Sequence, residues 1–264
     1  MLPFAICLLC LCAFLLCWYS RLPSLRGRVA SRVLAETDAT TLGRCVAASL
    51  VAHPNLSGIY PLPDPHGAFA ARIQLAGSAE RCLDVQYYIW NNDLTGVLLA
   101  QALIDTADRG VRVRVLLDDN NTRGLDSILA AFDAHPHIAV RLFNPFVIRW
   151  PRLGYLTDFA RANRRMHNKS FTADNQVTIV GGRNIGDEYF GATNGSLFID
   201  LDAMAIGPVV NKVSLQFDRY WNSDSSYPVR KLLRRVKADE RTRLAAAAQE
   251  VENSQRASGL SQSD

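Results

Sequence analysis

The sequence has little cysteine outside one apolar stretch, and it lacks long runs of charge of one sign. Four of its six cysteines lie in the first 20 residues, and only Cys45 and Cys82 lie beyond them. No disulfide framework and no zinc-ligand spacing follows from this pattern. The formal net charge is only +4, so an anionic partner is permitted but not required. Because no basic cluster is interleaved with aromatics, nucleic acid is not an expected partner.

The sequence also lacks an internal repeat, and it has a large apolar fraction. At 264 residues and 48% hydrophobic content, the chain can bury a substantial core. We therefore expect one large α/β domain with appendages at its two ends.

Residues 1–20, MLPFAICLLCLCAFLLCWYS, carry no charged side chain. At about 1.5 Å per residue a helix of this length approaches the thickness of a bilayer core, which predicts a transmembrane anchor. A cleaved signal peptide is the main alternative, although a basic start and a small-residue cleavage site are missing. Because Arg21, Arg26, Arg28 and Arg32 follow, the positive-inside rule favours a cytoplasmic catalytic domain.

Residues 21–66 are interpreted as a linker or entry region, because the prolines and glycines of 53–67 predict a break in regular structure. Residues 67–222 then alternate strands with helices, which predicts an α/β domain with a mixed, largely parallel sheet flanked by helices. The expected strands are 83–90, 111–119, 138–145, 169–174, 176–182 and 200–207. The expected helices are 68–82, 95–110 with Thr95 as its cap, 124–135 and 208–221.

Residues 223–264 are interpreted as a basic, then alanine-rich helical stretch followed by a polar tail. Leu232, Leu233 and Val236 alternate with basic side chains there. Such a helix could rest on anionic lipid, or it could be a solvated helix with one apolar side.

One short segment combines side chains suited to phosphate chemistry. RRMHNKSFTADNQVTIVGGRN, residues 164–184, contains His167, Lys169 and Asp174, then a glycine pair ending at Gly182, then Asn184. On a strand His167 and Lys169 would share a face, which places a nucleophilic imidazole beside a cation. A phosphodiester repels nucleophiles by its own charge, so its cleavage needs both groups. Asp174 falls past the strand, where it could accept hydrogen bonds from backbone amides.

This segment resembles the HxKxxxxD motif of the phospholipase D superfamily with its trailing GSxN element. Together with LDVQYYIW, RVLLDDNNTRGLD, RLFNPF and DLDAMAIGPVV, it is similar to the N-terminal half of bacterial cardiolipin synthases. The similarity is to the branch that joins phosphatidylglycerol to phosphatidylethanolamine, and it covers about residues 57–222. It implies a phospholipase D-like domain with one repeat, attached to the bacterial inner membrane by a single span.

The resemblance also implies roles for individual residues. His167 would be the nucleophile or the acid/base histidine, Lys169 and Asn184 would bind phosphate, and Asp174 would support the loop. Asp202 would orient the histidine. Gly182 stands where many relatives have serine, which would remove one hydrogen bond to phosphate. The motif implies neither a metal nor a cofactor, because the lysine supplies the positive charge.

The family brings two such motifs together, in one chain of about twice this length or by dimerisation, and this sequence contains one. The leading hypothesis is therefore phosphatidyl transfer through a phosphohistidine, with the second motif supplied by another chain or by a homodimer. The alternatives are a homodimeric phosphodiesterase or nuclease of the same superfamily, and a truncated, inactive membrane protein.

Overall fold

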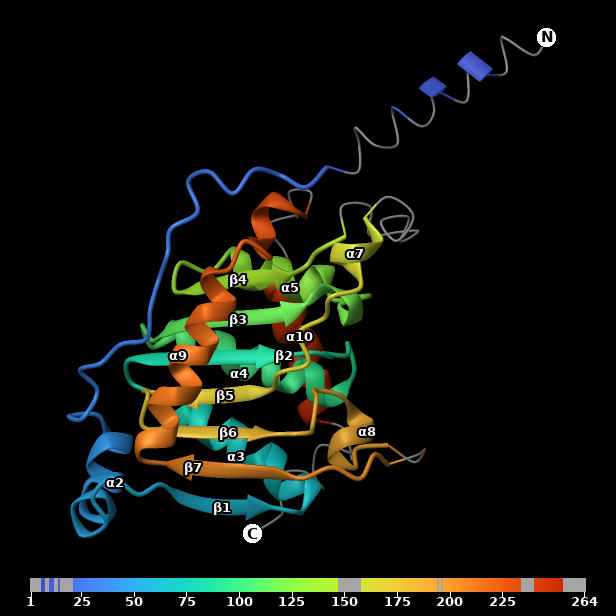
Figure 1. Cartoon of the computed structure of the whole chain (residues 1–264). Helices are drawn as coiled ribbons and strands as arrows, with labels where there is room; N and C mark the ends of the chain where they lie inside the picture. The colour runs from blue at the N-terminus through green and yellow to red at the C-terminus, as the bar shows by residue number, and fades with distance from the viewer. Residues whose placement is uncertain are drawn as a thin grey trace.

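The structure, a computed structural model, describes residues 6–7, 10–11, 14, 21–146, 158–193, 195, 197–233 and 240–253. At its centre lies an eight-stranded sheet in the order β1-β7-β6-β5-β2-β3-β4-β8 (Figure 1). The strands are β1 (Gly58–Leu62), β2 (Cys82–Tyr87), β3 (Arg112–Asp118), β4 (Ile138–Phe143), β5 (Ser170–Ala173), β6 (Val177–Gly181), β7 (Asp202–Ile206) and β8 (Ser226–Pro228).

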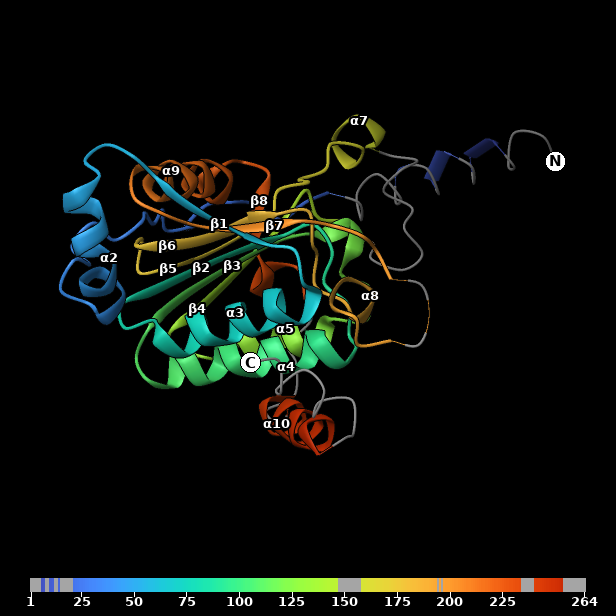
Figure 2. The same ribbon diagram turned by 90° about the horizontal axis from the view of Figure 1, so that it is seen from below.

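Helices cover both faces of this sheet, as the domain class requires. Figure 2 shows α3, α4 and α5 below the sheet, α10 beneath them, and α9 on the opposite face. The α-helices are α2 (Thr41–Ala52), α3 (Pro65–Ser78), α4 (Leu94–Asp108), α5 (Asp126–Asp133), α7 (Phe159–Ala162), α8 (Asp187–Phe190), α9 (Pro208–Asn222) and α10 (Glu240–Glu252). The α/β class with a mixed sheet is confirmed.

The prediction that the sheet is largely parallel is wrong. Parallel pairing joins β2 to β3 and β3 to β4, and the other neighbouring strands of the described sheet run antiparallel. The physical reason is the length of the connections. Helices α4 and α5 return the chain for parallel pairing, whereas three residues join β5 to β6 and force a hairpin.

Local sequence signals fix the ends of the helices. Asp64 caps α3 through a bond from Gly67 N, and Pro65 occupies the first turn, where its missing N–H does no harm. Helix α4 is capped by Asp93, which accepts a bond from Gly96 N at 3.0 Å, and not by the expected Thr95. Gly110 follows α4 with a φ of +88°, a backbone conformation that favours glycine.

The core lies mainly between the sheet and the layer of α3, α4 and α5. All six residues of β2 are buried, which fits a central strand covered on both faces. A smaller cluster on the other face packs α9 against the sheet through Leu116, Met166, Phe217 and Trp221. Residues at the ends of the central strands are thus held by a packed framework.

Residues 28–33, here named the N-terminal strap, lie against the end of α9. Arg28 donates to the carbonyl oxygens of Asn222 and Ser226, at 2.8 and 2.9 Å. The amide of Val33 donates to Asp218 Oδ2 at 2.9 Å. Part of the expected entry region also enters the sheet, because Gly58–Leu62 forms β1 beside β7.

The C-terminal region packs on the domain rather than extending from it. Strand β8 pairs with β4, and α10 contacts α4 and α5. Leu232 and Leu233 pack against the main core, while Val236 lies outside the described residues. The apolar side chains here therefore cover the protein's own helices.

Most of the expected transmembrane segment, residues 1–20, lies outside the described residues. Within the part of the chain that the structure describes, no helix has both the length and the apolar character needed to cross a membrane.

Candidate active site

His167 and Lys169 lie in an extended segment that leads into β5, and not on the strand itself as the sequence predicted. Asp118, the last residue of β3, holds this segment. Its carboxylate accepts bonds from Met166 N at 2.7 Å and from the Arg165 guanidinium at 3.0 Å. Burial raises the pKa of Asp118, and the charge of Arg165 opposes that shift. Asp118 is thus a buried carboxylate that fixes the two residues directly before His167.

The structure brings His167 and Lys169 together, as the spacing predicted. Lys169 Nζ lies 3.2 Å from Nδ1 and 3.3 Å from Nε2 of His167, and it donates to the His167 carbonyl oxygen at 2.9 Å. Tyr88 closes the cluster, with its ring centroid 4.8 Å from that of His167 and 5.6 Å from Lys169 Nζ. Lys169 is 7% exposed whereas His167 is exposed, so the imidazole faces solvent above a sheltered ammonium.

The surroundings favour a neutral imidazole. Burial, then the positive charge of Lys169, lowers the pKa of His167, and Asp200 acts in the opposite direction. Burial also lowers the pKa of Lys169, against the charges of Asp200 and Asp202. A neutral imidazole at physiological pH keeps its lone pair available for attack.

Asp200 also explains the second glycine of the pair. A Cβ added to Gly182 would lie 1.9 Å from Asp200 Oδ1, so a side chain here would displace the carboxylate. The amide of Gly182 donates to the carbonyl oxygen of Leu201 at 3.0 Å. Asp200 therefore occupies the space that a side chain at position 182 would need.

Asn184 lies near this cluster, but it is engaged in bonds within the protein. Its Oδ1 accepts a bond from the amide of Ile89 at 3.0 Å, and its Nδ2 donates to the Tyr189 hydroxyl at 3.1 Å. Since Ile89 follows Tyr88 directly, Asn184 fixes the chain beside the ring that contacts His167.

Asp202 binds two arginines instead of the histidine. Its Oδ2 accepts from Arg72 at 2.8 Å and lies 3.5 Å from Arg183, and its Oδ1 accepts from Arg183 N at 3.2 Å. The side chain is fully buried. Among the described contacts, the carboxylate whose charge acts on His167 is that of Asp200, two residues earlier.

Asp174 lies past the far end of β5 from His167, and the four residues of that strand alone span roughly 13 Å at 3.3 Å per residue. Its carboxylate accepts bonds from three successive backbone amides, those of Glu80, Arg81 and Cys82, at 3.0, 2.8 and 2.9 Å. The residue is fully buried and has a φ of +50°. These contacts tie the β5–β6 turn to the start of β2, the kind of amide binding expected from its position.

Two residues of the site escaped the sequence analysis. Tyr88 belongs to LDVQYYIW, where the strand pattern does not reveal a contact 79 residues ahead in the chain. Asp200 belongs to DLD, and the resemblance pointed to the second aspartate of that triplet. The signal for Asp200 is its position next to Gly182, which has no side chain. This proximity is visible only in the folded chain.

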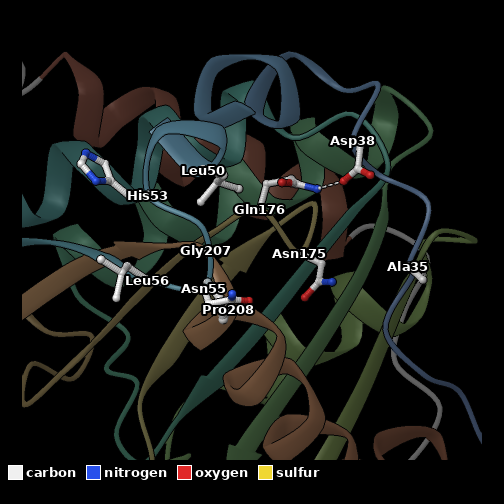
Figure 3. A pocket seen from close by; sticks show the side chains of 10 residues that line it. All are labelled: Ala35, Asp38, Leu50, His53, Asn55, Leu56, Asn175, Gln176, Gly207 and Pro208. Carbon is white, nitrogen blue, oxygen red and sulfur yellow. Dashed lines mark hydrogen bonds between the residues drawn. The ribbon is translucent and has the colours of Figure 1, made fainter. Parts of the chain in front are cut away.

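A separate cavity of about 290 Å³ lies among α2, the β5–β6 turn and the start of α9 (Figure 3). Gln176 lines it and donates from Nε2 to Asp38 Oδ1 at 2.9 Å. None of the site residues predicted from the sequence lines this cavity. Among the residues that the structure describes, no group of three His, Cys, Asp or Glu side chains could hold a metal ion.

Comparisons with known proteins find similar sequences and a similar fold. The chain is 62% identical to cardiolipin synthase C of Escherichia coli (strain K12) over 182 residues, which is 69% of this chain and 38% of that protein. It is 41% identical to an uncharacterised protein of Helicobacter pylori over 193 residues, 72% of this chain and 38% of that protein. The chain thus spans little more than a third of the length of these relatives.

One solved structure, phosphatidylserine synthase of Haemophilus influenzae, has a similar fold. Its TM-score is 0.52 at 14% identity, over 80% of this chain and 48% of that one. At the level of sequence, residues 72–221 match the family described as "Cardiolipin synthase, PLD-like domain". The match covers more than half of the chain and includes the His167 cluster. This chain therefore belongs to the family of cardiolipin synthase, PLD-like domains.

Proposed function

We propose that this chain supplies one half of an active site that transfers a phosphatidyl group in cardiolipin synthesis. The substrates are phosphatidylglycerol and phosphatidylethanolamine. The observation that carries the proposal is the cluster of an exposed, neutral imidazole over a sheltered ammonium, 3.2 Å apart. The 62% identity to a protein named cardiolipin synthase C supports the choice of reaction.

In the proposed reaction a nitrogen of His167 attacks the phosphorus of the first phospholipid. A phosphorus–oxygen bond breaks, the departing alcohol takes a proton, and a phosphohistidine forms. The hydroxyl of the second phospholipid then attacks phosphorus, releases the imidazole and gives the diester product. Lys169 faces the charge that develops on the phosphoryl oxygens, where a fixed cation is worth most.

The supporting residues divide into two groups. Asn184 and the backbone at Gly182 flank the phosphate position, and Asp200 is the positioning residue that acts on His167 through its charge. Asp202 binds Arg72 and Arg183, and Asp174 binds backbone amides, so both act through the framework. Asp174 therefore does not touch substrate in this proposal.

A second histidine is needed for the proposed reaction. In-line displacement places the attacking and leaving groups on opposite sides of phosphorus, and His167 reaches one side only. The proton donor comes from a second His-x-Lys motif, in a second copy of this chain or in another polypeptide segment.

The proposed site of action is the bacterial inner membrane, where both substrates reside. Residues 1–20 would attach the chain there, with the catalytic domain in the cytoplasm. The apolar side chains of Leu197, Phe198, Ile199 and Leu201 are exposed next to Asp200, which fits a site that meets lipid.

The test is to trap the intermediate. The full chain in detergent is incubated with phosphatidylethanolamine labelled at phosphorus, because phosphatidylglycerol carries the acceptor hydroxyl and phosphatidylethanolamine is therefore the donor. The reaction is quenched in alkali and analysed for labelled protein, since a phosphohistidine survives alkali and is lost in acid. We expect acid-labile label on the wild type and on Asp224→Asn, a change at a fully exposed residue remote from the site, and none on His167→Ala. Equal labelling of His167→Ala would overturn the role of His167.

Mixing tests the source of the second motif. If two copies form the site, mixing His167→Ala with wild type lowers transfer more than dilution does, because mixed dimers hold one histidine. If another segment supplies the motif, the chain alone makes no product and the added segment restores transfer. Robust cardiolipin formation by a monomer of this chain would contradict both arrangements.

A further inference from the structure

A second cavity, of about 400 Å³, lies at the opposite end of the sheet from His167. It is bounded by the N-terminal strap, the first residues of β3 and β4, the end of α9, and residues 228–231. In Figure 1 these strands begin at the left, where the blue N-terminal segment passes, whereas β5 begins at the right. Along the seven residues of β3 the two ends are roughly 20 Å apart.

The lining of this cavity is strongly basic. No Asp or Glu is among its lining residues. Its cationic side chains are Arg28, Arg112, Arg114, Arg141, Arg230 and Lys231. Apolar side chains, including Val113, Val140 and Trp221, form the rest of the wall.

Nearby carboxylates compensate only part of this charge. Arg114 is neutralised, because it binds Asp84 at 2.6 Å and Asp218 at 2.8 Å. Arg28 lies 3.7 Å from the fully exposed Asp224, a pair that solvent screens.

Two further cations bind uncharged partners. Arg141 donates to the carbonyl oxygen of Val29 at 2.6 Å, and Lys231 donates to that of Ser24 at 2.7 Å. A carbonyl oxygen satisfies a hydrogen bond without cancelling the charge.

Arg112 is the residue that points most directly to a ligand. Its Nε and Nη2 are buried and have no hydrogen-bond partner. Buried N–H groups that lack acceptors cost free energy, and such groups normally have a partner in folded proteins. Arg112 begins β3, so the sheet fixes its backbone at the wall of the cavity.

The pKa of the neighbouring Arg141 is lowered by burial and by the same excess of positive charge. Burial, then the charges of Arg28, Arg114 and Arg230, lowers the pKa of Arg141 to about 10. An anion in the cavity would oppose all of these repulsions together.

We propose that this cavity is a binding site for a phosphate group, carried either by free phosphate or by the headgroup of an anionic phospholipid. Planar guanidinium groups match phosphate oxygens in pairs, and Arg112 has two N–H groups free to do so. The cavity volume exceeds that of a phosphate ion, which leaves space for an attached glycerol. This site is distinct from the His167 cluster and uses none of its residues.

Calorimetry with inorganic phosphate tests the proposal. The full chain in detergent carries His167→Ala and Lys169→Ala, so that the proposed active site no longer contributes phosphate binding. We expect one phosphate to bind this background. Arg112→Gln should weaken binding at least about tenfold, since it removes a charged hydrogen-bond donor. Arg219→Gln, the same change on the exposed face of α9, is the matched control and should stay within about twofold.

Each outcome of this titration decides the proposal. Absence of phosphate binding by the background, or equal affinities for Arg112→Gln and Arg219→Gln, would overturn it. If Arg112→Gln does not fold, Arg112→Lys and Arg230→Gln replace it. Arg112→Lys keeps the charge but loses the paired donors, and Arg230 is 68% exposed, so both should fold and weaken binding.

Short-chain lipids separate the two sources of phosphate. The titration is repeated for the same variants with short-chain phosphatidylglycerol, and with short-chain phosphatidylcholine for comparison. A parallel loss for Arg112→Gln with phosphatidylglycerol assigns a lipid headgroup. A loss confined to inorganic phosphate assigns free phosphate.

Discussion

The two ends of β5 carry the two parts of one sequence motif, and they differ in almost every physical respect. At its start, Lys169 lies beneath an exposed His167 whose ring contacts Tyr88. At its end, Asp174 is fully buried and accepts bonds from three backbone amides. A four-residue strand thus separates a reactive group from the group that fixes the fold. A shared motif therefore does not mean a shared role.

The largest effect should come from Lys169→Ala. Loss of one fixed cation at a phosphoryl group should lower phosphatidyl transfer by about 10³-fold, or about 4 kcal/mol in the activation free energy. The free energy of unfolding should change by less than about 1 kcal/mol, because the lysine packs little core. Product formation on vesicles and urea unfolding measure the two quantities. Loss of the fold would make Lys169 structural and erase the contrast between the two ends.

The next effect should come from Asp174→Asn at the other end of the strand. An asparagine oxygen can accept the bonds of Arg81 and Cys82, but its NH₂ group would face the amide of Glu80. We expect the free energy of unfolding to fall by about 3 kcal/mol, the range for losing bonds to a buried charge. Urea unfolding measures it, and Asp200→Asn, which is partly exposed, is the control. Equal stability of both variants would contradict a framework role for Asp174.

A smaller effect on transfer is expected for Gly182→Ala, which tests the role of Asp200 at the His167 end of β5. The added methyl group would displace the Asp200 carboxylate. The Asp200 charge raises the pKa of His167, so its displacement makes the attacking nitrogen less basic and a weaker nucleophile. We therefore expect transfer at neutral pH to fall by about tenfold with little loss of stability. In the Asp200→Asn background the same substitution should have a smaller effect on kcat. Additive effects of the two changes would show that Gly182 acts independently of Asp200.

The smallest effect concerns pH. The pKa of His167 is lowered by burial and by Lys169, and Asp200 counteracts this. Activity that needs neutral imidazole is full above this pKa and is lost as pH falls through it. In Asp200→Asn the opposing charge is absent, so the pKa should fall further and activity should persist to lower pH. The titration of the His167 ring proton by NMR checks the direction, with Asp224→Asn, remote from the site, as control. A shift to higher pH in Asp200→Asn would refute the assigned role.

The sequence predicted those features that depend on neighbours along the chain. The alternation of strands and helices from β2 to β4 follows from apolar periodicity, and the His167–Lys169 contact follows from their spacing. The turn after β5 is also local, since Asp174 and Asn175 both have positive φ, as in tight hairpins. That turn makes β5 and β6 antiparallel, a consequence that the prediction of a largely parallel sheet overlooked.

Features that depend on distant partners could not be predicted. Asp200 and Asp202 stand two residues apart, yet one lies before β7 and acts on His167 while the other begins the strand and binds Arg72. Which of them meets the histidine depends on where the strand starts. Likewise, the basic cavity joins residues 27–31 to residues more than 80 positions away, which no pattern along the chain reveals.

The N-terminal strap also has a consequence for how the chain is made. The hydrogen bond from Val33 to Asp218 joins residues 185 positions apart, so the strap cannot bind α9 until α9 has been synthesised. At translation rates of about 5 to 20 residues per second the delay is roughly 10 to 40 s. During that time the strap has no partner on α9, although Arg114 and Arg141, which bind carbonyl oxygens of the strap, are made before α9. The described domain is therefore completed only when the strap docks on a helix made about 185 residues after it.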